Sequence, residues 1–152
     1  MHIGNYIELV YKGEQDLVRA FRMIADKHGD EPDVEESCKM LANWSEKLEQ
    51  QIKPFAAKYG EEKSKEPDRM MRTLFKEPRR GSLALLRDLH DVWLMTNEAE
   101  LCAIILRQAA SGLRDKALIA VCDDIEQQSK RQTTWLLTRI KSAAPQTLIA
   151  AK

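Results

Sequence analysis

Apolar residues recur along this chain at alternating spacings of four and three, which is the period of an α-helix that packs along one face. Two such runs, over residues 3–28 and 34–59, are each followed directly by a glycine. Glycine is common just past the end of a helix, so each run reads as one complete helix. Asp33 is suited to the N-cap position of the second helix.

The second part of the chain has two further runs with helical spacing. The first follows Ser82, whose hydroxyl is suited to an N-cap. The second ends shortly before Pro145, which cannot donate a backbone hydrogen bond to a continuing helix. We therefore expect helices over residues 82–113 and 116–141, and a tail over residues 146–152.

The connections between these helices predict their arrangement. Helices of about 26 residues, near 39 Å long, form antiparallel hairpins where the joining segments are short, as at the first and third connections. The middle connection, residues 60–81, is long enough to run the length of a helix at roughly 3.3 Å per residue. One long crossover between two hairpins is the ferritin-like arrangement, so we predict an all-α four-helix bundle over residues 1–145. The alternative is a simple up-and-down bundle.

The crossover leads to two further expectations. Because it precedes the third helix, we expect the helices over residues 3–28 and 82–113 to run parallel. A short helix is also expected over residues 68–76, and its buried side chains would be Met70, Met71, Leu74 and Phe75.

Polar residues interrupt the apolar pattern near the middle of every predicted helix. These residues, together with one neighbour, form what we call the polar layer: Glu14, Ser45, Thr96, Gln128, Ser129 and Gln132. Packed helices of equal length share their midpoints, so these side chains should meet at one level of the core. Glu14 should be buried and hydrogen-bonded to Ser45 or Gln128, and burial should favour its neutral form.

Two interpretations of the polar layer are open at this point. A buried polar group without a partner costs about 1–3 kcal/mol, so a polar layer needs a physical reason. One interpretation is a hydrogen-bonded network that fixes how the helices align. The other is a metal or ligand site built on facing helices.

Two helical hairpins, a long crossover and a polar level in the middle resemble the ferritin-like superfamily, which includes rubrerythrins and bacterioferritins. Local phrases that carry the resemblance are Tyr11-Lys12-Gly13-Glu14-Gln15, Leu41-Ala42-Asn43-Trp44-Ser45-Glu46-Lys47-Leu48, Thr138-Arg139-Ile140-Lys141 and Ala144-Pro145-Gln146. The resemblance implies a tendency to self-associate, here as a homodimer. It also implies a di-iron site in which the first and third helices each give a Glu and the other two each give Glu-x-x-His.

Most of these iron ligands are missing from this sequence. Glu14 matches the first ligand, and Glu98 or Glu100 lies near the third-helix position. The second-helix pair falls on Ser45 and Leu48. No Glu-x-x-His occurs anywhere in the chain, and the fourth-helix pair falls either on Glu126 and Ser129 or on Gln128 and Arg131.

We therefore expect no metal, no cofactor and no catalytic residue, and a structural or interaction role. The alternative is a residual iron- or manganese-dependent oxidoreductase with these ligands: Glu14, Glu98 or Glu100, and Glu126. His90 lies inside a helix, where a single histidine is more typical of helix packing than of catalysis. His28 ends the first helix, where a positive ring suits the helix dipole.

Composition indicates which classes of partner and which cellular compartment to expect. Lys and Arg number 24 and Asp and Glu number 24, and this zero balance argues against a nucleic-acid or anionic-membrane binder. Three cysteines without a C-x-x-C favour a reduced, cytoplasmic chain. No signal-peptide pattern occurs at the start, and the longest apolar run, residues 101–106, is too short to span a membrane. Three tryptophans lie beside the apolar runs and either pack between helices or form a dimer surface: Trp44, Trp93 and Trp135.

Overall fold

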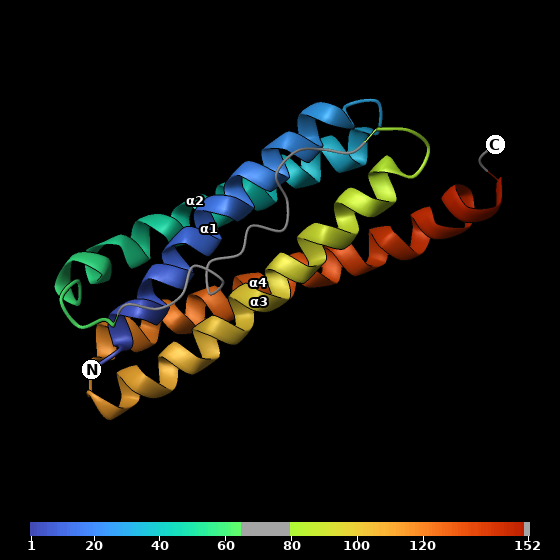
Figure 1. Cartoon of the computed structure of the whole chain (residues 1–152). Coiled ribbons are helices and arrows are strands. Elements are labelled where there is room, and N and C mark those ends of the chain that lie inside the picture. The colour runs from blue at the N-terminus through green and yellow to red at the C-terminus, as the bar shows by residue number, and fades with distance from the viewer. Residues whose placement is uncertain (65–79, 151–152) are drawn as a thin grey trace.

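The computed structural model describes residues 1–64 and 80–150, which form a bundle of four long α-helices (Figure 1). In chain order the elements are α1 (Ile3–Lys27), α2 (Pro32–Lys58), α3 (Ala84–Gly112), α4 (Lys116–Pro145) and the short π-helix η2 (Gln146–Ala150). Residues 1–64 and 80–150 contain no β-strand. The prediction of an all-α four-helix bundle is confirmed.

The four helices form two hairpins that pack side by side. α1 packs against α2 and α3 packs against α4, and the hairpins meet through α1–α3 and α2–α4 contacts (Figure 1). The end of α1 lies beside the start of α3, where His28 Nε2 is 2.9 Å from Asp88 Oδ2. The start of α1 lies beside the end of α3, where Tyr6 and Ala109 line one pocket. α1 and α3 therefore run antiparallel.

The prediction that the first and third helices run parallel is wrong. Ser64 lies against the start of α1, through hydrogen bonds with Asn5, whereas the start of α3 lies against the end of α1. A connection between these two points returns the chain to the end at which α2 began. α3 therefore runs in the direction of α2 and opposite to α1. The short helix expected over residues 68–76 lies outside the described residues.

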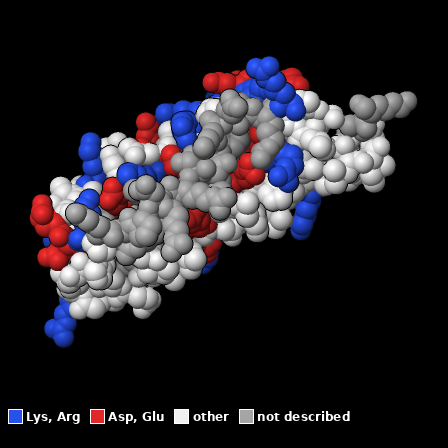
Figure 2. All heavy atoms as spheres, in the orientation of Figure 1, with Lys and Arg blue, Asp and Glu red and all other residues white. Residues whose placement is uncertain are grey.

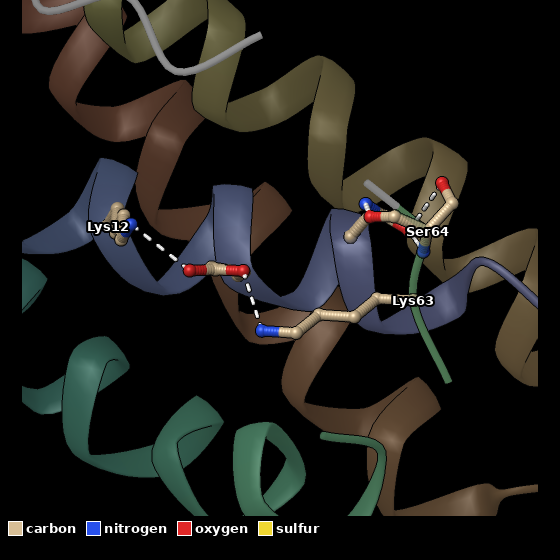
Figure 3. Close-up of polar contacts among 5 residues, drawn as sticks. Lys12, Lys63 and Ser64 are labelled. Carbon is tan, nitrogen blue, oxygen red and sulfur yellow. Dashed lines mark hydrogen bonds and ion pairs between the residues drawn. The ribbon is translucent and has the colours of Figure 1, made fainter. Parts of the chain in front are cut away.

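The segment that leaves α2 is held on the first turns of α1. Asn5 Nδ2 donates to the Ser64 carbonyl oxygen over 2.9 Å, and Ser64 N donates back to Asn5 Oδ1 over 2.9 Å (Figure 3). The Glu8 carboxylate lies between two cations, with Lys12 Nζ at 3.1 Å and Lys63 Nζ at 3.2 Å (Figure 3). These contacts fix the point at which the crossover starts.

Gly4 allows this segment to approach α1 closely. Its amide donates to the Glu62 carbonyl oxygen over 2.7 Å. A Cβ at this position would lie 2.6 Å from the Tyr59 carbonyl oxygen and 2.7 Å from that of Glu62. Both neighbours are backbone atoms that cannot rotate away, so a side chain at Gly4 would displace the segment.

Two helix starts differ from the sequence expectation. α2 begins at Pro32 with Glu31 as its N-cap, so Asp33 lies in the first turn and is not the cap. Proline suits the first helical position because its fixed φ is helical and its missing N–H would have no partner there. α3 begins at Ala84 with Leu83 as N-cap and without a side-chain cap, so Ser82 does not cap it.

Pro145 does not end α4 as expected. α4 continues through Pro145 into the π-helix η2, so Gln146–Ala150 is helical where a tail was expected. The ring of proline permits helical φ, and its missing N–H leaves only one carbonyl without its helical partner, at an exposed helix end. α2 runs through the exposed Pro54, as the predicted helix over residues 34–59 implied.

Asp115 fixes the turn between α3 and α4. Its Oδ1 accepts the Leu118 amide over 3.1 Å and so caps α4. Its Oδ2 accepts Tyr59 Oη over 2.7 Å and Lys58 Nζ over 2.8 Å, both from the end of α2. The Lys58 ammonium, followed by the Tyr59 hydroxyl, lowers the pKa of Asp115 to about 2. One carboxylate thus joins the two hairpins at this end of the bundle.

Candidate functional site

The core consists of two apolar clusters, one toward each end of the bundle. One cluster contains Leu17, Phe21, Leu41, Val92 and Leu136, and the other contains Val10, Leu48, Cys102, Leu106 and Ile125. On α1, α2 and α4 the residues of the polar layer lie between these clusters, whereas Thr96 on α3 lies within the first cluster, between Met95 and Ala99. Glu14, Ser45, Thr96, Ser129 and Gln132 are each 0% exposed, and Gln128 is half-buried. A polar level therefore divides the core.

Gln132 links α4 to α2 within this level. Its Nε2 donates to Ser45 Oγ over 2.7 Å and to the Leu41 carbonyl oxygen over 3.2 Å. Both amide hydrogens of Gln132 are thus used, and both acceptors lie on α2. This bond pair fixes the axial position of α4 against α2, because sliding either helix by a turn would break both bonds.

Thr96 links α3 to α4 at the same level. Its Oγ1 donates to the Trp93 carbonyl oxygen over 2.9 Å and accepts from Thr133 Oγ1 over 3.0 Å. Thr133 was missed by sequence reasoning because it lies beside the seam of α4 and not on it. Its position next to Gln132 was the available signal.

Glu14 is the only carboxylate of the polar layer. Neither of its oxygens makes a hydrogen bond of normal geometry, so the expected bond to Gln128 is not formed. The Ser45 hydroxyl is close enough to act on the carboxyl group, so the expected contact with Ser45 is present only as a loose one. Burial raises the pKa of Glu14 to about 8; the nearby Ser45 hydroxyl opposes this rise and the Glu49 carboxylate adds to it. Because no cation in residues 1–64 and 80–150 offsets the desolvation of Glu14, the neutral acid is the main form at pH 7.

Other polar atoms in the layer also lack protein partners. They are Ser129 Oγ, Gln128 Oε1 and Gln132 Oε1. Gln132 therefore pairs its donors and leaves its acceptor free. Some polar groups of this layer thus form hydrogen bonds between helices, and others form none.

The residual metal candidates do not converge on Glu14. Glu98 is exposed, and Glu100 and Glu126 are half-buried. Glu126 accepts Lys130 Nζ over 3.2 Å on its own helix. Across residues 1–64 and 80–150, no group of three or more His, Cys, Asp or Glu side chains is placed to hold a metal ion. A di-metal centre needs several deprotonated ligands at one level, and this donor set does not fit it.

A buried His–Asp pair lies outside the polar layer. His28 and Asp88 are 7% and 0% exposed and join α1 to α3 at 2.9 Å. Sequence reasoning assigned His28 only to the helix dipole and missed Asp88. The signal was that His28 occupies the last position of an apolar seam, where a polar side chain needs a partner. His90, by contrast, is exposed.

The cysteines are suited to packing and not to nucleophilic chemistry. All three are buried and free. Burial raises the pKa of Cys38 and Cys122 to about 12 and that of Cys102 to about 11, so their thiols stay protonated at neutral pH. The tryptophans Trp44, Trp93 and Trp135 are partly buried against the first apolar cluster.

No protein-family model, curated protein or solved structure matches the chain. None of the helices α1 to α4 is long and apolar enough to cross a membrane.

Proposed function

We propose that this chain is a ferritin-like bundle that has lost its di-metal site and acts through protein–protein contact, as a homodimer in the cytoplasm. We expected parallel first and third helices in such a bundle, and their antiparallel course contradicts that expectation. The ferritin-like part is supported by the connectivity: a long connection that returns the chain to the end at which α2 began makes α1 and α3 antiparallel, whereas an up-and-down bundle makes them parallel.

The composition of the polar layer carries the proposal. In place of several anionic and imidazole ligands, the level holds one carboxylate, two hydroxyl-bearing serines, a threonine and amides. Neutral hydroxyl and amide oxygens are weak metal ligands. Glu14, with its raised pKa, would have to lose a proton before it could bind a cation. The layer is better suited to aligning the helices.

Metal content tests this function. The full chain, purified without added metal, should carry no stoichiometric iron, manganese or zinc by elemental analysis. A chelator should leave its melting temperature unchanged, because no ion contributes to folding. Near-unit occupancy that is lost in Glu14→Gln and kept in Glu98→Gln would overturn the proposal and support a metal-dependent oxidoreductase instead.

A further inference from the structure

The outer face of α3 carries a row of exposed apolar side chains. Leu101 is 56% exposed, Leu94 is 39% exposed, and Ile104 and Ile105 are each 38% exposed. The spacings of seven, three and one place them on one side of the helix, opposite the buried side that faces the core. Elsewhere on α2 and α4, exposed large apolar residues such as Met40 and Leu137 are isolated. In Figure 2 the surface over the second half of α3 carries few charged side chains.

Two opposite charges flank this row on its α4 side. Glu100 and Arg107 are separated by seven residues, so they lie on the same edge of the face. Arg107 Nε contacts Asp123 Oδ1 on α4 at 2.6 Å, which identifies that edge. Among the described residues, no cation forms an ion pair with Glu100. The edge therefore presents one acidic and one basic group, one helical repeat apart.

An apolar pocket opens beside the end of the same row. It has a volume of about 440 Å³ and lies between the start of α1 and the end of α3. Ile105, Ala109 and Gly112 line its α3 side. Ala109 has only a methyl group and Gly112 has no side chain, which leaves room for a larger side chain from outside.

We propose that this face of α3 binds the same face of a second copy, with the two α3 helices antiparallel about a twofold axis near Cys102 and Ala103. This assignment rests on the proposed homodimer and names its surface. About the axis, Leu101 packs against Ile104 of the second copy, and each contact occurs twice by symmetry. Glu100 then faces Arg107 of the second copy across the α4-side edge.

The same arrangement fills the pocket. Leu94 of the second copy lies at the level of Ser111 and Gly112, which is where the pocket opens. In a parallel pair the α4-side edge of one copy would instead face the opposite edge of the other, so Glu100 and Arg107 would not face each other across the interface. Leu94 of the second copy would then lie at the level of Leu94, away from the pocket beside Gly112. Charge and shape complementarity both favour the antiparallel pair.

The oligomeric state of the full chain tests the surface. Sedimentation at increasing concentration should show a monomer–dimer equilibrium. Leu101→Lys should raise the dissociation constant at least about tenfold, because it places two ammonium groups at the centre of the interface. Met40→Lys, at an exposed position of α2, is the matched control and should leave it unchanged. A monomer at every concentration, or equal effects of the two substitutions, would overturn the assignment.

A charge exchange tests the orientation. Glu100→Arg and Arg107→Glu should each weaken the dimer. Because Arg107 also pairs with Asp123 of its own chain, all of these variants are compared in an Asp123→Asn background, where the double exchange should restore the dimer since each new charge again faces its opposite. Cross-linking gives a second measurement. A short bis-maleimide should link Leu101→Cys to itself, since the two positions are only about 4.5 Å apart along the helix axis. It should not link Leu94→Cys to itself, since those positions are about 25 Å apart. Efficient linking of Leu94→Cys would instead indicate a parallel pair and overturn the proposal.

These outcomes separate the two proposals. A metal-free monomer would remove the α3 surface and leave the loss of the di-metal site standing. A dimer that resists every α3 substitution would keep the homodimer but move it to another surface. Stoichiometric bound metal would overturn the proposed function whatever the state of assembly.

Discussion

The imidazole of His28, at the end of α1, lies 2.9 Å from the carboxylate of Asp88 near the start of α3. Both side chains are buried, and sixty residues separate them in the sequence. The pair joins the two hairpins at the end of the bundle opposite Asp115, which joins them through α2 and the α3–α4 turn. Polar contacts thus connect the hairpins at both ends and at the polar layer between.

Removal of one partner of this pair should destabilise the bundle strongly. Asp88→Ala should lower the free energy of unfolding by about 3 kcal/mol, because it leaves a buried imidazole without its acceptor. Glu46→Ala is a suitable control, since its ion pair with Arg22 is exposed on both sides and should be worth about 0–1 kcal/mol. Urea denaturation monitored by circular dichroism measures both. Equal losses in the two variants would contradict the structural role of His28 and Asp88.

Glu14 should make stability depend on pH. Its pKa is about 8 in the folded chain against an ordinary value of 4.5, so the folded state holds a proton that the unfolded chain has released. The stabilisation is complete below about pH 4.5 and is lost as the pH rises toward 8, by at most about 1.4 kcal/mol per pH unit. Glu14→Gln should remove this dependence and leave stability at pH 7 unchanged or higher. Its amide also supplies donors to a level with unpaired acceptors.

Denaturation curves of the wild-type chain and of Glu14→Gln at pH 5, 6.5 and 8 would measure this difference. Glu46→Gln, at an exposed position, should keep the wild-type profile. Parallel profiles for all three proteins would show that Glu14 does not titrate in this window. A loss of more than about 3 kcal/mol in Glu14→Gln at neutral pH would point to a buried charge pair instead.

Ser45 and Gln132 should be energetically coupled. A double-mutant cycle with Ser45→Ala and Gln132→Leu should give a coupling energy of about 0.5–1.5 kcal/mol for their 2.7 Å bond. The double variant should be less destabilised than the sum of the single ones, because no buried donor is left without its acceptor. Strictly additive effects would mean that this hydrogen bond contributes nothing to stability.

Asp115 should contribute to stability in two separable ways. Asp115→Ala removes the cap of α4 and should cost about 0.5–2 kcal/mol. Asp115→Asn can keep the cap but loses the charge that pairs with Lys58. Because the pKa of Asp115 is lowered to about 2, its charge stabilises the fold above about pH 3.8 and the effect fades as the pH falls through 2. Acid unfolding of wild type should therefore be steeper in this range than that of Asp115→Asn.

The sequence alone determined the helices and the buried side of each, because helical periodicity is a local property. The seams of residues 3–28 and 34–59 match the buried faces of α1 and α2. The apolar patterns of all four helices also located the level at which polar residues interrupt the core, since the midpoints of helices of equal length coincide in a bundle. These residues are Glu14, Ser45, Thr96, Ser129 and Gln132. Local signals were weaker at the helix ends, where Pro145 and Asp33 suggested boundaries that the backbone does not follow.

The direction of α3 and the partners inside the core depend on how the four helices pack, and the sequence pattern does not contain them. Periodicity gives no information on which end of a bundle a long connection reaches, so the pairing of His28 with Asp88 was beyond its reach. Periodicity likewise shows that Gln132 is buried, but not that its amide donates to the Ser45 hydroxyl while the Glu14 carboxyl group makes no hydrogen bond of normal geometry. Whether two such side chains form a hydrogen bond depends on differences of a few tenths of an ångström in the distance between atoms on different helices. These distances are set when the four helices pack together, and no single helix contains them.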